Sequence, residues 1–256
     1  MEGYEEFIRR IHGKIHLDLS KYKENQLKRR IIQFMERYKI SDFPAFFRLL
    51  EQDSDVLVRF RDYVTINTSE FFRDQKVFEY INDKVITEWE RVRRPVKVWS
   101  AGCSVGAEPY SISILCMQKK LRNVSILATD YDRTILGKAK AGVFSSSHVK
   151  NVSVDLRGKY FECKQNDYAI RKEIKDSVVF KEHNLLSDRF PDQTDLILCR
   201  NVFIYFNHDV QQELIEKFSR AVKPGGYFVI GSSEFINAPE RFGLEKQSFS
   251  VYKKVV

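Results

Sequence analysis

A glycine-bearing turn between a strand and a helix constrains the fold of this chain most. The apolar segment 96–100 predicts a buried strand, Gly102 and Gly106 follow it, and an apolar helix face begins after them. Glycine lets the backbone approach a ligand closely, and the first turn of a helix presents free N–H groups. The sequence therefore predicts a strand–loop–helix unit that can hold a small ligand against its backbone.

Further strands and helices alternate along the rest of the chain. Strands are predicted over residues 125–129, 195–199, 227–231 and 249–252, and helices over 135–141 and 210–222. This alternation predicts an α/β fold, Rossmann-like, with a mainly parallel sheet and helices on both faces. The segment 156–183 breaks the alternation and predicts a small antiparallel insert, either a hairpin or three strands that include 178–181.

The chain before the sheet is predicted to be helical. Leu27, Ile31, Phe34 and Tyr38 form one apolar helix face, and two short helices are expected around 43–50 and 56–64. Asp42 has the character of an N-cap, with Pro44 in the first turn after it. We therefore expect a helical domain over 1–72, a linker and connecting helix over 73–95, and an α/β domain over 96–256.

Composition narrows the classes of protein to consider. No apolar run approaches the ~20 residues that cross a bilayer, and the acidic start does not resemble a signal peptide, so a cytoplasmic protein without membrane insertion is expected. The four cysteines form no CxxC pair, which argues against a metal site. The net charge of +8 favours an acidic partner, either nucleic acid, anionic lipid or an acidic protein.

Two carboxylates near the glycine loop indicate the kind of ligand. Glu108 at the helix start would repel a pyrophosphate and suits S-adenosylmethionine, which carries a sulfonium and an ammonium and no phosphate. The Gly-x3-Gly spacing also differs from the GxGxxG of dinucleotide sites. Asp130, at the end of the next strand, is placed to bind both ribose hydroxyls, although it or Asp132 could instead cap a helix. These residues favour an adenosine-containing ligand and leave NAD and S-adenosylmethionine both open.

Several motifs, taken in order, resemble one known family. They are Asn67-x-Ser-x-Phe-Phe-Arg73-Asp, Trp99-Ser-Ala-Gly-Cys-Ser-x-Gly-x-Glu108-Pro-Tyr-Ser, Ala128-Thr-Asp130-Tyr-Asp, Cys199-Arg-Asn-Val-x-Ile-Tyr-Phe206, Lys223-Pro-Gly-Gly and Gly231-Ser-Ser-Glu234. The chain resembles the chemotaxis receptor methyltransferases, the CheR family, over nearly its whole length. In that family Gly-Glu-Glu-Pro is usual, whereas this chain has Ala107 in place of the first acid.

The resemblance implies an activity and a set of site residues. Members transfer a methyl group from S-adenosylmethionine to glutamate side chains on the cytoplasmic helices of bacterial chemoreceptors, leaving S-adenosylhomocysteine. The cofactor-binding residues would be Asn67, Ser69, Arg73, Gly102, Glu108, Asp130, Asn184, Leu185, Asn201 and Val202. Arg73 and Tyr205 would lie nearest the reacting methyl group. Whether the insert docks on a receptor C-terminal peptide stays open, and a monomer is expected.

A basic stretch in the helical part predicts a docking surface for acidic receptor helices. Between Lys21 and Lys39 there are seven Lys or Arg and two Glu, a local charge of +5. A solvated helix face is the simpler alternative. The residues predicted to dock the substrate are Lys21, Lys28, Arg29, Arg30 and Arg37.

Other functions are less well supported by the sequence. A methyltransferase for another protein or for nucleic acid would agree with the basic charge, but the Asn/Asp-Pro-Pro-Tyr/Phe motif of amino-group methylation does not occur, and Cys199 lacks the Pro-Cys or Thr-Cys setting of a pyrimidine nucleophile. An NAD-dependent oxidoreductase is disfavoured by the loop spacing and by Glu108. A receptor-binding module without activity is disfavoured by Arg73, Asp130 and Tyr205.

Overall fold

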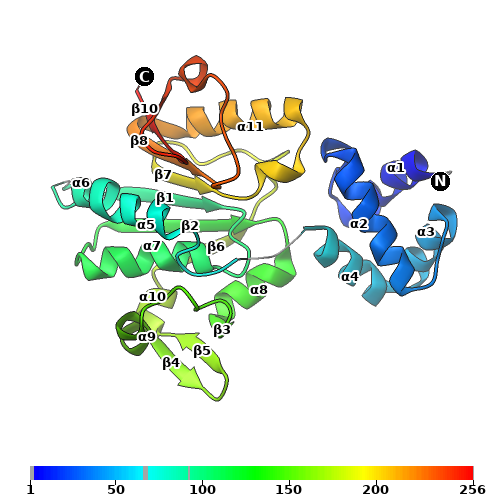
Figure 1. Ribbon diagram of the computed structural model, residues 1–256, viewed down its shortest axis with the longest axis horizontal. Helices are drawn as coiled ribbons and strands as arrows, with labels where there is room; N and C mark the ends of the chain where they lie inside the picture. The colour runs from blue at the N-terminus through cyan, green and yellow to red at the C-terminus, as the bar shows by residue number, and fades with distance from the viewer. Residues whose placement is uncertain (1–2, 66–68, 92, 256) are drawn as a thin grey trace. The chain divides into compact units, whose positions relative to one another are not determined.

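The chain forms two compact units in the computed structural model, which describes residues 3–65, 69–91 and 93–255. The helical unit comprises Met1–Asn67 together with Tyr205–Gln211, and the sheet unit comprises Thr68–Ile204 and Gln212–Val256 (Figure 1). Within the described residues, no helix is long and apolar enough to cross a membrane.

Four helices and a short 3-10 turn make up the N-terminal part of the helical unit. They are α1 (Tyr4–Ile15), η1 (Leu19–Lys21), α2 (Glu24–Arg37), α3 (Phe43–Gln52) and α4 (Ser54–Thr65). The predicted N-cap is confirmed, since Asp42 Oδ1 accepts a hydrogen bond from the Ala45 N–H at 2.8 Å. The predicted apolar face of α2 is buried at Leu27, Ile31 and Phe34.

Phenylalanine rings fill the core of the helical unit. Phe46 and Phe60 lie 5.3 Å apart between ring centroids, and Phe7 and Phe34 contact both of them at 5.4–6.0 Å. Each fully buried ring contributes about 1.5–3 kcal/mol of transfer free energy. All four helices of this part therefore meet on one aromatic cluster, to which each contributes one Phe.

A later segment of the chain joins the helical unit. The Lys23 N–H donates to the Tyr205 carbonyl at 2.9 Å, and the Asn207 N–H donates to the Lys21 carbonyl at 3.0 Å. Tyr22 and Phe206 form an antiparallel bridge, with their ring centroids 5.1 Å apart. This segment, Tyr205–Gln211, begins at the last residue of the turn η3 (Phe203–Tyr205) and continues into the start of α11 (His208–Ala221).

A seven-stranded sheet in the order β6-β2-β1-β7-β8-β10-β9 forms the sheet unit. The strands are β1 (Val96–Ala101), β2 (Val124–Asp130), β6 (Val178–Glu182), β7 (Thr194–Cys199), β8 (Val222–Ile230), β9 (Leu244–Lys246) and β10 (Val251–Lys254). The first five strands in that order pair in parallel. Strand β10 pairs antiparallel with both β8 and β9. The predicted mainly parallel, Rossmann-like sheet is confirmed, and its strand order reverses between β1 and β7, where such sheets bind ligands.

Helices pack against this sheet, and part of the predicted connecting segment 73–95 also packs against it. Two of the helices that contact the sheet are α7 (Ala107–Gln118) and α8 (Arg133–Ala141), and α11 also contacts it, since its Phe218 packs against Trp99 in β1 and Phe228 in β8. A 3-10 turn, η4 (Pro239–Phe242), precedes β9. Residues 75–89 form α5 (Gln75–Tyr80), a π-helix (Ile81–Ile86) and α6 (Thr87–Trp89). Ile81, Val85 and Trp89 are buried in the core with β1, so this stretch is an integral part of the sheet unit.

The small antiparallel sheet exists and contains the predicted hairpin, formed by Phe161–Lys164 and Asp167–Ile170, but its third strand differs from the prediction. Its order is β3-β5-β4, formed by Val143–Ser145, Asp167–Ile170 and Phe161–Lys164, with α9 (Val154–Tyr160) and α10 (Lys172–Lys175) nearby in the chain. The segment 178–181 belongs instead to β6, which pairs in parallel with β2. The third strand was missed because β3 is three residues long and buries only Phe144, which gives no periodic pattern.

Candidate functional site

Polar residues gather where β1, β2 and β7 end at the same edge of the sheet. Both Gly102 and Cys103 donate their N–H groups to the Thr129 carbonyl, at 2.8 and 2.9 Å. The His183 N–H donates to the Asp130 carbonyl at 3.0 Å, which brings the segment 183–185 beside the end of β2. The structure thus brings together the predicted residues Gly102, Asp130, Asn184 and Leu185, and all of them lie at the carboxyl end of the parallel strands.

The loop between β1 and α7 needs its glycines. Gly102 and Gly106 have φ angles of +75° and +86°, in the left-handed region that other residues rarely adopt. A Cβ atom on Gly102 would lie 2.7 Å from Cγ2 of Val202, another predicted site residue. Ser104 in this loop has a buried hydroxyl with no hydrogen-bond partner among the described residues. A buried polar group of this kind is one that a ligand can satisfy.

Asp130 is held by the backbone of the same loop. Its Oδ2 accepts from the Ser104 N–H at 2.8 Å, and its Oδ1 accepts from the Asp132 N–H at 3.0 Å. Burial raises the pKa of this carboxyl. A carboxylate offers about four acceptor positions, and the backbone N–H groups of Ser104, Tyr131 and Asp132 occupy three of them, so Asp130 can still accept from a ribose hydroxyl. The capping role falls to Asp132, which accepts from the N–H groups of Thr134 and Ile135 at the start of α8.

Glu108 takes part in a buried charge network that the sequence did not reveal. Its Oε1 accepts from the Ser100 hydroxyl at 2.7 Å, and its Oε2 accepts from Nη1 of Arg200 at 3.3 Å. Arg200, whose side chain is 3% exposed, also donates through Nη2 to Asp74 Oδ2 at 2.6 Å. Glu108 therefore shares the cation of Arg200 with Asp74, so its charge is partly compensated within the protein. An arginine directly after a strand buried at every position was the signal that could have identified Arg200.

Arg73 lies in a short segment whose backbone is fixed on both sides. Phe72 and Asp74 have φ angles of +51° and +60°, a conformation that costs on the order of 1–3 kcal/mol per residue outside glycine. The Phe72 N–H donates to Ser111 Oγ at 3.0 Å, and Nη2 of Arg200 donates to the Arg73 carbonyl at 2.8 Å. Such strain persists only where surrounding contacts fix the backbone, and it is typical of functional sites.

A second buried carboxylate supports Asn201 and Val202. Glu234 accepts from the N–H groups of Gly231, Asn201 and Ile204 at 2.6, 3.0 and 3.2 Å, and burial raises its pKa. Asn201 has a φ angle of +59°. The sequence had placed Glu234 in a family motif without assigning it a role. The structure shows that it ties the ends of β7 and β8 together beneath the site.

Three of the remaining predicted cofactor-binding residues, Ser69, Asn184 and Leu185, lie within the described residues. Asn184 Oδ1 accepts from the Leu186 N–H at 3.0 Å, so the turn role considered for this residue is present. Leu185 and Ser69 are half-buried. Asn67 lies outside the described residues. Ala107 is fully buried, so an acid at that position would be cut off from water.

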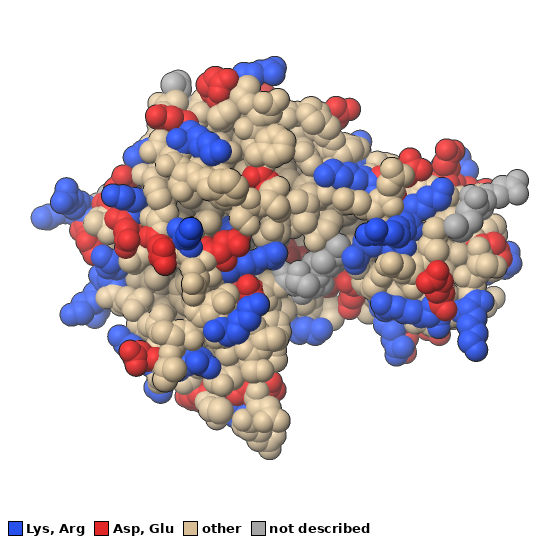
Figure 2. All heavy atoms as spheres, in the orientation of Figure 1, with Lys and Arg blue, Asp and Glu red and all other residues tan. Residues whose placement is uncertain are grey.

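Tyr205 and the basic residues of α2 all belong to the helical unit. The guanidinium groups of Arg30 and Arg37 lie over the ring of Tyr63, at 4.7 and 4.5 Å from its centroid, and Arg30 also donates to the Tyr63 carbonyl. Figure 2 shows Lys and Arg side chains gathered on the surface around α2. Within the described residues, no ion pair joins the predicted docking residues to an acid; these are Lys21, Lys28, Arg29, Arg30 and Arg37.

Comparisons with known proteins match the chain along its length. The family model described as CheR methyltransferase, SAM binding domain, matches residues 67–251, and the CheR methyltransferase all-alpha domain matches residues 2–65. A chemotaxis protein methyltransferase from Listeria innocua is 37% identical over 95% of this chain and 94% of its own length. One from Borreliella burgdorferi is 30% identical over 96% of this chain and 92% of its own length.

Proposed function

The chain belongs to the CheR methyltransferase family, whose larger domain binds S-adenosylmethionine, and from this premise we propose that it methylates chemoreceptors. The substrates are glutamate side-chain carboxylates on the cytoplasmic helices of bacterial chemoreceptors, and the products are glutamate methyl esters and S-adenosylhomocysteine. The reaction takes place in the cytoplasm, where these helices lie. The observation that carries the proposal is the 37% identity to a chemotaxis protein methyltransferase over 95% of this chain.

The residues at the sheet edge fit an adenosine-containing cofactor. Gly102 leaves no room for a Cβ atom beside the side chain of Val202, so the loop requires glycine at this position. The Ser104 hydroxyl is buried without a partner among the described residues, and Asp130 keeps an acceptor position for a ribose hydroxyl. When bound, S-adenosylmethionine supplies an electrophilic methyl group on a positively charged sulfur.

No general base is needed for the attack. A glutamate with a pKa of about 4.3 is already ionised at neutral pH. The catalytic task is therefore to align the carboxylate oxygen with the methyl carbon, and positioning alone can lower such barriers by roughly 7–11 kcal/mol. Arg73 would hold the carboxylate through charge-assisted hydrogen bonds, and Tyr205 would orient it. The fixed backbone around Arg73 suits a positioning role, because the guanidinium then starts from a defined place.

The basic surface of α2 supports an acidic protein as the substrate. Its cations are exposed or half-buried, and Lys28, Arg30 and Arg37 lie over aromatic rings, with no ion pair to a carboxylate among the described residues. Glutamate-rich helices of a receptor would supply the missing negative charge. This arrangement favours a protein partner that carries several acids along one surface.

A transfer assay tests the proposal. The protein is incubated with methyl-labelled S-adenosylmethionine and a receptor cytoplasmic fragment, and the label is then treated with mild base. Label that is released as methanol and maps to glutamates would support the proposal, and the same fragment with those glutamates changed to Ala should accept none. Base-stable label, or label on nucleic acid in place of the fragment, would refute it.

A further inference from the structure

A cavity in the helical unit lies between α1 and the segment that leads into α2. It has a volume of about 480 Å³, within the range of roughly 300–1,000 Å³ that is typical of small-molecule sites. Glu5, Asp18 and Glu24 contribute carboxylates to its lining, and Ile8 and Leu19 contribute buried apolar side chains. All of these residues belong to the helical unit, so the cavity does not depend on the sheet unit.

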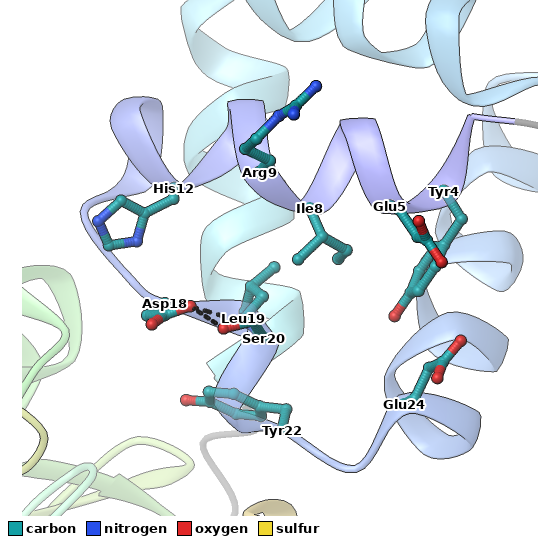
Figure 3. A pocket seen from close by; sticks show the side chains of 10 residues that line it. All are labelled: Tyr4, Glu5, Ile8, Arg9, His12, Asp18, Leu19, Ser20, Tyr22 and Glu24. Carbon is teal, nitrogen blue, oxygen red and sulfur yellow. Dashed lines mark hydrogen bonds between the residues drawn. The ribbon is translucent and has the colours of Figure 1, made fainter.

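The carboxylates lie at two ends of the cavity. Figure 3 shows Glu5 and Glu24 at one end and Asp18 at the other, with the two apolar side chains between them. Among the described residues, Glu5 and Glu24 form no ion pair. Asp18 accepts the N–H and the hydroxyl of Ser20 through Oδ1, at 3.1 and 2.5 Å, which leaves Oδ2 for another donor. Negative charge is therefore available at both ends.

The hydroxyl of Tyr4 points into the end that holds Glu5 and Glu24. Tyr4 is 7% exposed, and Figure 3 shows its hydroxyl directed towards Glu24. No residue of the described chain forms a hydrogen bond with this hydroxyl. Burial, together with the charge of Glu24, raises the pKa of Tyr4 to about 12, so the phenol is neutral at neutral pH. A polar group this deeply buried is normally hydrogen-bonded, and a neutral phenol oxygen can accept from an ammonium.

The cations near the cavity leave its acidic ends accessible. Arg9 points away from the cavity, and His12 lies towards the end that holds Asp18 (Figure 3). Lys28 lies over the ring of Tyr4, with its Nζ 4.9 Å from the ring centroid, and it is not part of the lining. A metal ion fits poorly, because no three acids, thiols or imidazoles of the described residues lie close enough to hold one. The lining is therefore suited to an extended organic cation.

We propose that this cavity binds an aliphatic diamine, with one ammonium beside Glu5 and Glu24 and the other beside Asp18. The first ammonium would donate to the Tyr4 hydroxyl, and the alkyl chain would lie along the apolar middle of the cavity. A ligand with a single ammonium, such as a lysine side chain of another protein, would leave one acidic end without a partner. The inference goes beyond the proposed methylation and does not depend on it.

Calorimetry on the full chain with ligands of five carbons tests the charge pattern. Cadaverine carries two ammonium groups, pentylamine carries one, and glutarate carries two carboxylates. Cadaverine should bind, and pentylamine should bind about tenfold more weakly, the effect of one hydrogen bond to a charged group. Glutarate should not bind. Equal affinities for pentylamine and cadaverine would overturn the diamine in favour of a lysine side chain. Absence of binding by both cadaverine and the longer spermidine would overturn the site.

Matched variants locate the bound diamine. E5Q/E24Q removes both acids of one end, and the control E6Q/E36Q removes one acid from each of the same two helices outside the lining. Tyr4→Phe removes the hydroxyl and keeps the ring against Phe43, 5.3 Å away between centroids. Cadaverine affinity should fall at least about tenfold in E5Q/E24Q and several-fold in Tyr4→Phe, and should change less than about twofold in the control.

Circular dichroism of each variant confirms that it is folded before its affinity is compared. Equal affinities of E5Q/E24Q and E6Q/E36Q for cadaverine would show that the diamine binds elsewhere on the protein, and would overturn the proposal.

Discussion

Arg200 in the sheet unit and Arg30 and Arg37 in the helical unit have opposite surroundings. In the sheet unit, Arg200 is buried and bonded to two carboxylates and a carbonyl. In the helical unit, Arg30 and Arg37 lie over the ring of Tyr63, and within the described residues no acid pairs with them. A buried charge needs its partners to avoid a desolvation cost, and the partners then fix the surrounding backbone. A cation that contacts a ring or a carbonyl but no carboxylate keeps its charge available to an acidic molecule.

The largest effect is expected from removing the buried arginine. Arg200→Leu leaves Glu108 and Asp74 without their cation, so the free energy of unfolding should fall by about 3–5 kcal/mol. Denaturant unfolding followed by circular dichroism measures this. As a control, Arg220→Leu removes an exposed partner of Glu216 and should cost no more than about 1 kcal/mol. Equal stability of the two variants would contradict the role given to the Arg200 network.

Arg73 should matter for turnover more than for folding. Arg73→Ala removes the group proposed to hold the carboxylate, and kcat should fall about a hundredfold, as for the loss of one oxyanion donor. The free energy of unfolding should change by less than about 1 kcal/mol, because the backbone contacts of residues 72–74 remain. A normal methylation rate at saturating receptor and cofactor would remove Arg73 from the mechanism.

Two neighbouring aspartates should separate cofactor binding from helix capping. Asp130→Ala should weaken S-adenosylhomocysteine binding by about 1–3 kcal/mol, the loss expected for ribose hydrogen bonds. Asp132→Ala should leave that affinity nearly unchanged and lower stability by about 1 kcal/mol through loss of the α8 cap. Calorimetry measures both affinities, and NAD should not bind either variant or the wild type. The reverse pattern between the two aspartates would assign their roles the other way round.

The smallest effect per residue is expected on the basic surface of α2. Reversing Lys28 and Arg29 to Glu should raise the half-saturating receptor concentration several-fold, since exposed pairs contribute about 0.2–1 kcal/mol each. Salt should weaken wild-type binding more than that of the reversed variant, because the Debye length falls from about 10 Å at 0.1 M to about 3 Å at 1 M. The same salt dependence for both proteins would argue against electrostatic docking.

The sequence predicted what depends on local patterns. The Phe-rich helices, the parallel strands and the glycine loop all follow from periodicity or from the backbone freedom of glycine, and each was placed within a few residues. Contacts between residues far apart in the chain could not be predicted from the sequence. Arg200 meets Asp74 and Glu108 because β7 ends beside α5 and α7. The segment that begins with Tyr205 joins the helical unit through backbone hydrogen bonds to Lys21 and Lys23. The third strand of the small sheet was misplaced for the same reason, since pairing partners are not visible in a short segment.

The central claim is that the sheet unit holds the cofactor and that the basic surface of the helical unit docks the acidic receptor, and one paired measurement tests it most directly. The affinity for S-adenosylhomocysteine and the half-saturating concentration of receptor fragment are determined for Asp130→Ala and for K28E/R29E. Asp130→Ala should lose cofactor affinity and keep the receptor value, and K28E/R29E should do the opposite. If each variant lost both, or if K28E/R29E alone lost cofactor affinity, the division of roles between the two units would be contradicted.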